Sequence, residues 1–320
     1  MQKFLEDVEK GLSSSPKYLP SKYFYDEIGD DLFVQIMHLP EYYLTRAELE
    51  IFTDKSNQII DTLDMKPDVY FELIELGAGD GLKTKMLLKQ LQNRSYTFDY
   101  LPIDISQHAL DSLEASLKVD LPELGIKKQQ GDYFDILATL KNSQNPKVIL
   151  FLGSNIGNMS DEIANQFIRD MGSNLNVNDK LLIGVDLIKD PSIVLPAYND
   201  SQGVTRDFNL NLLHRINKEL GGTFKIEQFA HQPTYTKEDG VARSFLVSLI
   251  NQQVEITSLG KRFSFSEGEK IATEVSRKYD DEIISKLIQA TDFHTIKRLT
   301  DSKNLFANYI FKKGKSDSTS

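Results

Sequence analysis

The 320-residue chain contains no cysteine. This absence excludes disulfide bonds, catalysis by a thiolate and the usual structural zinc sites, whose ligands include cysteine. The five histidines are scattered and show no metal-ligand spacing such as His-x-x-x-His, so no metal site is expected. The lack of cysteine also suits a reducing compartment.

Long apolar runs and an excess of basic residues are also missing. No apolar run approaches the length that spans a bilayer, and the first ten residues alternate charged with apolar side chains, unlike a signal peptide. Lys and Arg number 37 against 47 Asp and Glu, a net charge of −10. Because such a chain repels phosphate backbones, nucleic acid is not expected as a partner. We therefore expect a cytoplasmic protein without a membrane partner.

One stretch, residues 69–84, combines a strand pattern, three glycines and the start of a helix pattern. Residues 69–76 are mostly aromatic and aliphatic, as a buried parallel strand requires. Gly77, Gly79 and Gly81 then permit a tight turn and close approach of a ligand, and a helix N-terminus offers free N–H groups. The stretch is interpreted as a nucleotide-cofactor site, although a glycine turn that binds nothing also fits it.

Two further segments follow predicted strands and carry acidic side chains. Asp104 ends an apolar strand about 25 residues beyond the glycines, where a carboxylate accepts both ribose hydroxyls of an adenosine. Alone, it fits a helix cap or a solvated loop charge better, but its pairing with the glycine turn favours a ligand. Asp132 and Tyr133 offer an acid and a ring to an adenine. Residues 151–158 bring small residues and amides to the place where a second substrate would meet the cofactor.

Strands and helices alternate through residues 66–188, which predicts a parallel sheet with right-handed crossovers. Ser106 and Ser160 are expected helix caps. The strands are expected near 69–76, 98–103, 147–152 and 180–187.

The pattern changes after residue 189. An apolar helix face ends at Gly221-Gly222, and helical periodicity returns at 281–290. Antiparallel-type strands are expected at 223–230, 243–250, 252–257 and 262–265, and a final hairpin at 293–299 and 305–311. That hairpin points away from a nicotinamide dehydrogenase. Residues 312–320 are predicted to be a frayed tail.

Four tyrosines, Tyr23, Tyr25, Tyr42 and Tyr43, lie close together near the N-terminus. They fit either ordinary packing or an aromatic wall around a small polar or cationic ligand. Just after them, Thr45 and the glutamate three residues later form a capping-box pattern for a helix running to about residue 63.

The series Glu75-x-Gly77-x-Gly79-x-Gly81, then Asp104 and Asp132, resembles the cofactor-binding series of class I S-adenosylmethionine-dependent methyltransferases. The final hairpin fits that fold too. Over nearly the whole chain, five longer segments in order resemble the L-histidine Nα-methyltransferase family of the ergothioneine pathway: 19–26, 39–46, 151–158, 197–205 and 273–278. The glycine turn departs from the family by carrying Asp80 where Ser or Thr is frequent, and 231–250 aligns poorly.

The resemblance implies three sets of site residues. The cofactor set is Gly77, Gly79, Lys83, Asp104, Asp132 and Tyr133. The set around the amine and carboxylate of the amino acid is Tyr25, Tyr42, Asn158 and Tyr198, of which Tyr25 and Asn158 would position the amine as the catalytic pair. The imidazole would be held by Glu274 and Ser276, although Glu274 also fits a salt bridge with Arg277 or Lys278.

The resemblance further implies an α/β fold, a Rossmann-like class I methyltransferase sheet with a second α+β substrate-binding domain. The substrate-binding domain is expected from 8–53 and 189–278, and the S-adenosylmethionine-binding domain from 54–188 and 279–320. The implied reaction is three successive methylations of L-histidine, giving hercynine. Another amino acid or indole amine, or a catalytically silent cofactor-binding regulator, remains open. A monomer is the default, because no interface pattern is visible.

Overall fold

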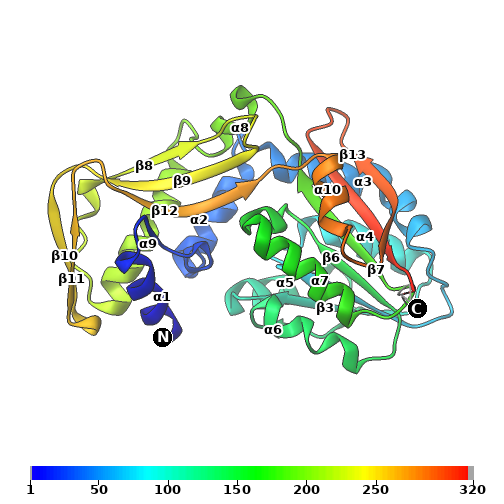
Figure 1. Cartoon of the computed structure of the whole chain (residues 1–320). Helices are drawn as coiled ribbons and strands as arrows, with labels where there is room; N and C mark the ends of the chain where they lie inside the picture. The colour runs from blue at the N-terminus through cyan, green and yellow to red at the C-terminus, as the bar shows by residue number, and fades with distance from the viewer. Residues whose placement is uncertain (1, 316–320) are drawn as a thin grey trace, which may run out of the picture. The chain divides into compact units, whose positions relative to one another are not determined.

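The computed structural model describes residues 2–315, without the side chains of Leu137 and Leu140. The chain forms two compact units, each assembled from two separate stretches (Figure 1). The first unit consists of the chain up to Tyr43 together with Lys189–Ser276, and the second unit of Leu44–Ile188 and the chain from Arg277 on. The first boundary between the units lies after Tyr43, whereas it is expected at residue 53 from the sequence. It lies earlier because Ala47, Ile51 and Phe52 pack into the core of the second unit.

Within the described residues, the second unit holds an eight-stranded sheet in the order β13-β14-β7-β6-β2-β3-β4, with β5 also beside β3. Strands β2, β3, β6 and β7 pair in parallel, and β14 lies antiparallel between β13 and β7. This is the Rossmann-like α/β sheet, with a final antiparallel hairpin, that is expected from the sequence. The strands are β2 (Phe71–Leu76), β3 (Phe98–Asp104), β4 (Gly125–Ile126), β5 (Gln129–Gln130), β6 (Lys147–Phe151), β7 (Lys180–Asp186), β13 (Phe293–Thr300) and β14 (Phe306–Lys313).

Helices cover both faces of this sheet (Figure 1). Residues of α3, α4 and α5 share one core with the sheet, and residues of α6, α7 and α10 share the other. Every residue of β6 and β7 is buried, as expected for strands covered on both faces. The helical segments are α3 (Tyr43–Leu63), α4 (Leu82–Asn93), α5 (Gln107–Asp120), α6 (Tyr133–Leu137), η2 (Leu140–Asn142), η3 (Asn155–Asn158), α7 (Asp161–Asn174) and α10 (Asp281–Ile288).

The two predicted helix caps of the second unit are confirmed. Ser106 Oγ accepts a hydrogen bond from the Ala109 amide at 3.1 Å, and Ser160 Oγ accepts one from the Ile163 amide at 3.3 Å. Each capped helix follows a parallel strand, either directly or after a loop. These helices therefore start at the edge of the sheet where the strands have their carboxyl ends.

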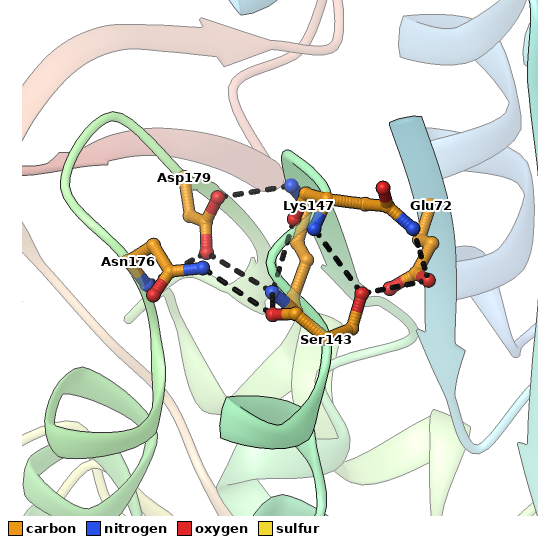
Figure 2. A network of polar contacts seen from close by, with 6 residues as sticks. Glu72, Ser143, Lys147, Asn176 and Asp179 are labelled. Carbon is orange, nitrogen blue, oxygen red and sulfur yellow. Dashed lines mark hydrogen bonds and ion pairs between the residues drawn. The ribbon is translucent and has the colours of Figure 1, made fainter. Parts of the chain in front are cut away.

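A buried polar network lies at the amino end of β6 (Figure 2). The fully buried Lys147 ammonium donates to the carbonyls of Ser143 at 2.7 Å and Asn145 at 3.0 Å, and lies 3.9 Å from Asp179 Oδ2. Ser143 Oγ in turn donates to Glu72 Oε1 at 2.9 Å. The network ties the start of β6 to β2 and β7, at the end of the sheet opposite to its ligand-binding carboxyl edge.

The first unit has a four-stranded sheet in the order β1-β12-β9-β8 and a separate hairpin of β10 and β11 among its described residues. Its strands are β1 (Lys17–Tyr18), β8 (Phe229–Thr234), β9 (Val241–Ser248), β10 (Gln252–Ile256), β11 (Lys261–Phe265) and β12 (Lys270–Arg277). Its helical segments are α1 (Gln2–Ser13), η1 (Ser21–Phe24), α2 (Glu27–His38), α8 (Pro191–Ala197), α9 (Val204–Leu220), η4 (Ile226–Gln228) and η5 (Thr257–Leu259). The apolar face of α9 packs into one core with α1, α2 and the strands, and Gly221 ends α9 with φ +66° as predicted.

Three sequence expectations differ from the structure. The strand expected at 223–230 is wrong, because Ile226–Gln228 forms a 3₁₀ turn and β8 begins only at Phe229. Strand β12 was not predicted, although it carries Glu274 and Ser276. The expected tail is partly strand, since β14 runs to Lys313, while residues 316–320 lie outside the described part.

Candidate cofactor and substrate sites

The glycine turn between β2 and α4 adopts left-handed backbone at all three glycines, with φ of +72°, +53° and +63° at Gly77, Gly79 and Gly81. A Cβ on Gly77 would lie 2.7 Å from Asn155 Nδ2, and one on Gly81 would lie 2.4 Å from Leu113 Cδ1. A Cβ on Gly79 would meet nothing within 4 Å. A Cβ at Gly77 or Gly81 would therefore displace a neighbouring side chain, whereas Gly79 exposes its backbone on an open side where a ligand can approach.

Asp104, at the end of β3, is bonded to that turn. Its Oδ2 accepts a hydrogen bond from the Gly79 amide at 3.0 Å, and its Oδ1 accepts one from the Ser106 amide at 3.0 Å. Burial raises the pKa of this carboxyl above its usual value, although the backbone donors act in the opposite direction. A carboxylate has about four acceptor sites, so Asp104 can hold the turn and still accept ribose hydroxyls.

The segment after β5 carries Asp132 and Tyr133. Asp132 caps α6 by accepting a hydrogen bond from the Phe134 amide at 3.0 Å. The Tyr133 ring packs edge-on against Phe151 and Phe167, with centroid distances of 5.4 and 5.6 Å. Burial and the nearby carboxylates raise the pKa of Tyr133 to about 12, so its hydroxyl stays protonated at neutral pH. Both residues follow a strand neighbouring β3, and so share the edge where the glycine turn lies.

Lys83 lies in the first turn of α4 and forms an ion pair within the second unit. Its ammonium lies 2.5 Å from Glu48 Oε2, and the Gly153 amide donates to the same oxygen at 2.8 Å. The Glu48 side chain is fully buried. The capping box expected for Thr45 and Glu48 is therefore wrong: α3 begins at Tyr43, before Thr45, and Glu48 binds partners distant in the sequence.

A second buried carboxylate, Glu75, lies near the end of β2. Thr84 Oγ1 donates to its Oε1 at 2.7 Å, and the Tyr100 hydroxyl donates to its Oε2. Burial raises the pKa of Glu75 to about 7, against the lowering effect of these two donors and of Lys83. The side chain thus links β2, β3 and α4 beneath the glycine turn, and no ligand group is needed to satisfy its oxygens.

The loop after β6 contains η3, which ends at Asn158. Ser154 Oγ accepts a hydrogen bond from the Asp186 amide at 3.0 Å, and a Cβ on Gly157 would lie 2.7 Å from the Arg277 carbonyl oxygen. The backbone of this loop is therefore fixed by packing, while the Asn158 side chain is exposed. An exposed amide on a fixed loop suits the recognition of a polar ligand.

The four tyrosines of the N-terminal region divide into two pairs. The Tyr23 hydroxyl donates to Asp7 at 2.7 Å, and the Lys189 ammonium donates to the Tyr43 hydroxyl at 3.0 Å. Tyr25 and Tyr42 are half-buried and both pack edge-on against Phe33, with centroid distances of 5.6 and 6.3 Å. The structure thus brings together the two tyrosines that the family resemblance selects.

Glu274 and Ser276 lie two residues apart on β12, so their side chains project to the same face of the strand. The Tyr198 hydroxyl donates to Ser276 Oγ at 2.8 Å, and both side chains are buried. Ser244 Oγ on β9 donates to Glu274 Oε2 at 3.0 Å. Three predicted residues therefore belong to two hydrogen-bonded pairs on one face of β12, and Ser244 is a further member that the sequence did not indicate, because its pairing with Glu274 depends on the unexpected strand β12.

Arg277 and Lys278 each lie beside a carboxylate other than Glu274. Arg277 Nη2 lies 3.1 Å from Asp161, and the fully buried Lys278 ammonium lies 2.8 Å from Asp186. Each of the two cations thus has an acidic partner within the second unit.

The predicted residues divide between the two units. The cofactor set and Asn158 belong to the second unit, and Tyr25, Tyr42, Tyr198, Glu274 and Ser276 belong to the first. In the described part of the chain, no helix has the length and apolar character needed to cross a membrane. Among residues 2–315, no three His, Asp or Glu side chains gather as a metal-binding group.

Comparison with known proteins gives consistent matches over nearly the full length. Residues 4–313 match the family described as histidine-specific, S-adenosylmethionine-dependent methyltransferases. The chain is 34% identical to the histidine N-alpha-methyltransferase of Mycolicibacterium smegmatis over 285 residues, which cover 89% of this chain and 87% of that protein. It is also 34% identical to the protein of the same name from Mycobacterium tuberculosis, over 94% of this chain and 92% of that protein. Ergothioneine biosynthesis protein 1 of Schizosaccharomyces pombe is 30% identical over 96% of this chain, which spans 40% of that longer protein.

Proposed function

Since this chain belongs to the family of histidine-specific, S-adenosylmethionine-dependent methyltransferases, we propose that it methylates the α-amine of L-histidine. The observation that carries the substrate assignment is the polar cluster on β12, in which Glu274 and Ser276 face the same side and are held by Ser244 and Tyr198. The product would be Nα,Nα,Nα-trimethylhistidine, hercynine. The match to an ergothioneine biosynthesis protein supports a place in that pathway.

S-adenosylmethionine, when bound, supplies an activated sulfonium methyl group. The residues of the second unit fit such a ligand. The open side of Gly79 allows the cofactor to approach the backbone closely. The free acceptor sites of Asp104 suit ribose hydroxyls. Asp132 and Tyr133 suit the adenine amino group and ring. Gly77 makes the turn, and Lys83 places a cation beside it.

Tyr25 and Asn158 are proposed to orient the amine, and Tyr198 and Asn158 to hold the carboxylate. Methyl transfer requires a neutral amine lying about 3 Å from the methyl carbon, on the axis opposite sulfur, so orientation is the main task of the protein. Since the sulfonium is already activated, no strong general base is essential. The amine still loses a proton in each cycle, and Tyr25 or water is proposed to carry it away.

The imidazole of the substrate is proposed to donate a ring N–H to Glu274 and to bond Ser276. Ser244 fixes the carboxylate of Glu274, and Tyr198 fixes the hydroxyl of Ser276. A site of this kind rejects analogues without the matching groups, because its own polar groups would then stay unpaired. The faces of Tyr25 and Tyr42 are proposed to stabilise the growing alkylammonium, which suits three successive transfers.

The test is to incubate the purified protein with S-adenosylmethionine and L-histidine and to follow S-adenosylhomocysteine and each methylated histidine by mass spectrometry. Successive appearance of mono-, di- and trimethylhistidine supports the proposal. Cofactor binding without any turnover would favour a silent regulator instead. Turnover of an indole amine in preference to histidine would agree with methyltransferase activity but contradict the proposed imidazole site.

We also propose that the enzyme acts in the cytoplasm as a monomer. The absence of cysteine suits a reducing compartment. Size-exclusion chromatography with light scattering tests the oligomeric state, and fractionation of producing cells tests the location.

A further inference from the structure

We infer that Glu48 is a positioning residue for the cofactor: from α3 it holds both Lys83 and the turn at Gly153 in the places that S-adenosylmethionine requires. Neither the family series nor the predicted site residues include it. Because the inference concerns the proposed cofactor site, it rests on the proposed function. Glu48 touches no reacting atom, and its effect would pass through the two loops that it joins.

The contacts of Glu48 connect three separate parts of the second unit. One carboxylate oxygen, Oε2, accepts both from the Lys83 ammonium at 2.5 Å and from the Gly153 amide at 2.8 Å. Lys83 follows the glycine turn after β2, and Gly153 begins the loop after β6. A single buried oxygen therefore sets the distance between the loops at the carboxyl ends of two adjacent parallel strands.

The sheet leaves space for this carboxylate at Gly184 of β7. A Cβ on Gly184 would lie 2.0 Å from Glu48 Oε1, so any other residue there would displace the side chain. Gly184 does not adopt the left-handed backbone conformation, and its backbone alone therefore does not demand glycine. The need for glycine arises mainly from Glu48, and a Cβ there would also lie 3.0 Å from Phe306 Cε1.

The other oxygen of Glu48, Oε1, lies beside Gly184 of β7. Asn308 of β14 is paired with Gly184 in the antiparallel ladder, and directly opposed residues project to the same face of a sheet. Within the described residues, the buried Glu48 Oε1 and both side-chain polar atoms of Asn308 have no hydrogen-bond partner. Among the described residues, the Glu48 carboxylate is therefore held through Oε2 alone.

The expected consequence is loss of cofactor affinity when Glu48 is neutralised. Lys83 would lose the negative charge of its Glu48 partner, and the Gly153 turn would lose a charge-assisted bond. Small displacements of positioning groups change ligand interactions by large factors. We expect Glu48→Gln to weaken binding of S-adenosylhomocysteine about tenfold or more, with the KM for histidine changed less than about twofold.

The experiment measures the Kd for S-adenosylhomocysteine by calorimetry, together with both KM values, kcat and Tm. Gly184→Ala is the second variant, because it moves Glu48 without altering it and lies outside the cofactor set. The controls are Asp54→Asn, an exposed carboxylate on the same helix, and Gly172→Ala, where the added Cβ meets its nearest neighbour at an ordinary 3.5 Å. Both controls should bind the cofactor product as the wild type does.

A double-variant comparison separates positioning from general stability. In a Lys83→Met background, Glu48→Gln should weaken S-adenosylhomocysteine binding much less than it does alone, because its main partner is already absent. A lowered Tm with unchanged Kd in Glu48→Gln would overturn the inference, as would independent, multiplying effects of the two substitutions.

The outcome can be separated from that of the proposed function, because binding of S-adenosylhomocysteine requires no histidine. A protein that never methylates histidine but loses affinity in Glu48→Gln would leave this inference standing. Normal histidine methylation with unchanged affinity in Glu48→Gln and Gly184→Ala would overturn it alone. A wild type that binds no S-adenosylhomocysteine would overturn both.

Discussion

The Tyr198 hydroxyl donates a hydrogen bond to Ser276 Oγ at 2.8 Å, although the residues are 78 positions apart in the chain. The family resemblance assigns Tyr198 to the substrate carboxylate and Ser276 to the imidazole. The bond therefore links a residue assigned to the carboxylate with a residue assigned to the imidazole, so a change in the position of one side chain affects the other. Both side chains are buried, so their bond is protected from competition with water.

Tyr198→Phe removes this bond and keeps the ring. We expect kcat/KM for histidine to fall by about 1–3 kcal/mol of transition-state stabilisation, mostly through KM, because a buried polar group loses its partner. Steady-state kinetics with varied histidine measure it. Tyr23→Phe is the matched control, since it loses a hydroxyl bonded to Asp7 in the same unit; an equal rise in the histidine KM there would contradict a specific role for Tyr198.

Glu274→Ala removes the proposed acceptor of the imidazole N–H. We expect kcat/KM for histidine to fall by about 2–4 kcal/mol, because one partner of a buried, charged hydrogen bond is lost. The affinity for S-adenosylhomocysteine should stay unchanged. Unaltered histidine turnover in this variant would remove Glu274 from the site.

Ser244→Ala tests whether the position of Glu274 matters as well as its charge. The variant keeps the carboxylate and removes the hydrogen bond from Ser244 Oγ to Glu274 Oε2. We expect a smaller loss, about 1 kcal/mol in kcat/KM for histidine, and no change in the KM for S-adenosylmethionine. Parallel titrations of both substrates provide the comparison, and an increase confined to the cofactor KM would speak against it.

Gly79→Ala tests the open side of the glycine turn. The φ of +53° makes alanine strained by about 1 kcal/mol, but the added Cβ meets no protein atom within 4 Å. Gly260→Ala is a matched control, because Gly260 has φ +59° and equally open space in the first unit. Both variants should lose similar stability in thermal unfolding, whereas only Gly79→Ala should weaken S-adenosylhomocysteine binding in calorimetry. Equal affinities in the two variants would exclude a ligand at Gly79.

Glu75 predicts a specific pH dependence of stability. Burial raises its pKa from the ordinary 4.5 to about 7 in the folded chain. Between these values the folded state binds a proton that the unfolded state has released. The contribution of Glu75 to stability is therefore full below about pH 4.5 and declines as pH rises to about 7, by on the order of 3 kcal/mol.

Urea unfolding of the wild type and Glu75→Gln at several pH values between 5 and 8 measures this term. The wild type should lose stability relative to the variant as pH rises, because glutamine does not titrate. A constant difference across that range would mean that Glu75 titrates normally in the folded chain.

Much of the second unit is predictable from the sequence, because its signals are local. The apolar runs that form β2, β6 and β7 are almost wholly buried, β3 is at least half-buried throughout, and the glycines that follow β2 supply the left-handed turn. The final hairpin also has a short connection, residues 301–305, with residues that favour turns. In each case, neighbouring residues in the chain determine the structure that they adopt.

Long-range partners were harder to predict. Glu48 lies three residues after Thr45 and therefore fits a local capping box, yet its partners Lys83 and Gly153 are 35 and 105 positions away. Strand β12 was missed because its polar residues, including Glu274 and Ser276, interrupt the apolar pattern that marks a strand. At such positions, polar residues proposed for the site occupy places where a strand would otherwise carry apolar residues. The sequence pattern that predicts the strand is therefore weaker there.

The most direct test of the central claim is one competition assay. The purified protein is incubated with S-adenosylmethionine and an equimolar mixture of the twenty amino acids plus histamine, and all products are identified by mass spectrometry. The account predicts trimethylation of histidine alone, and no methylation of histamine, which has the ring and amine but lacks the carboxylate that Tyr198 and Asn158 are proposed to hold. Methylation of tryptophan or of histamine in preference to histidine would contradict it.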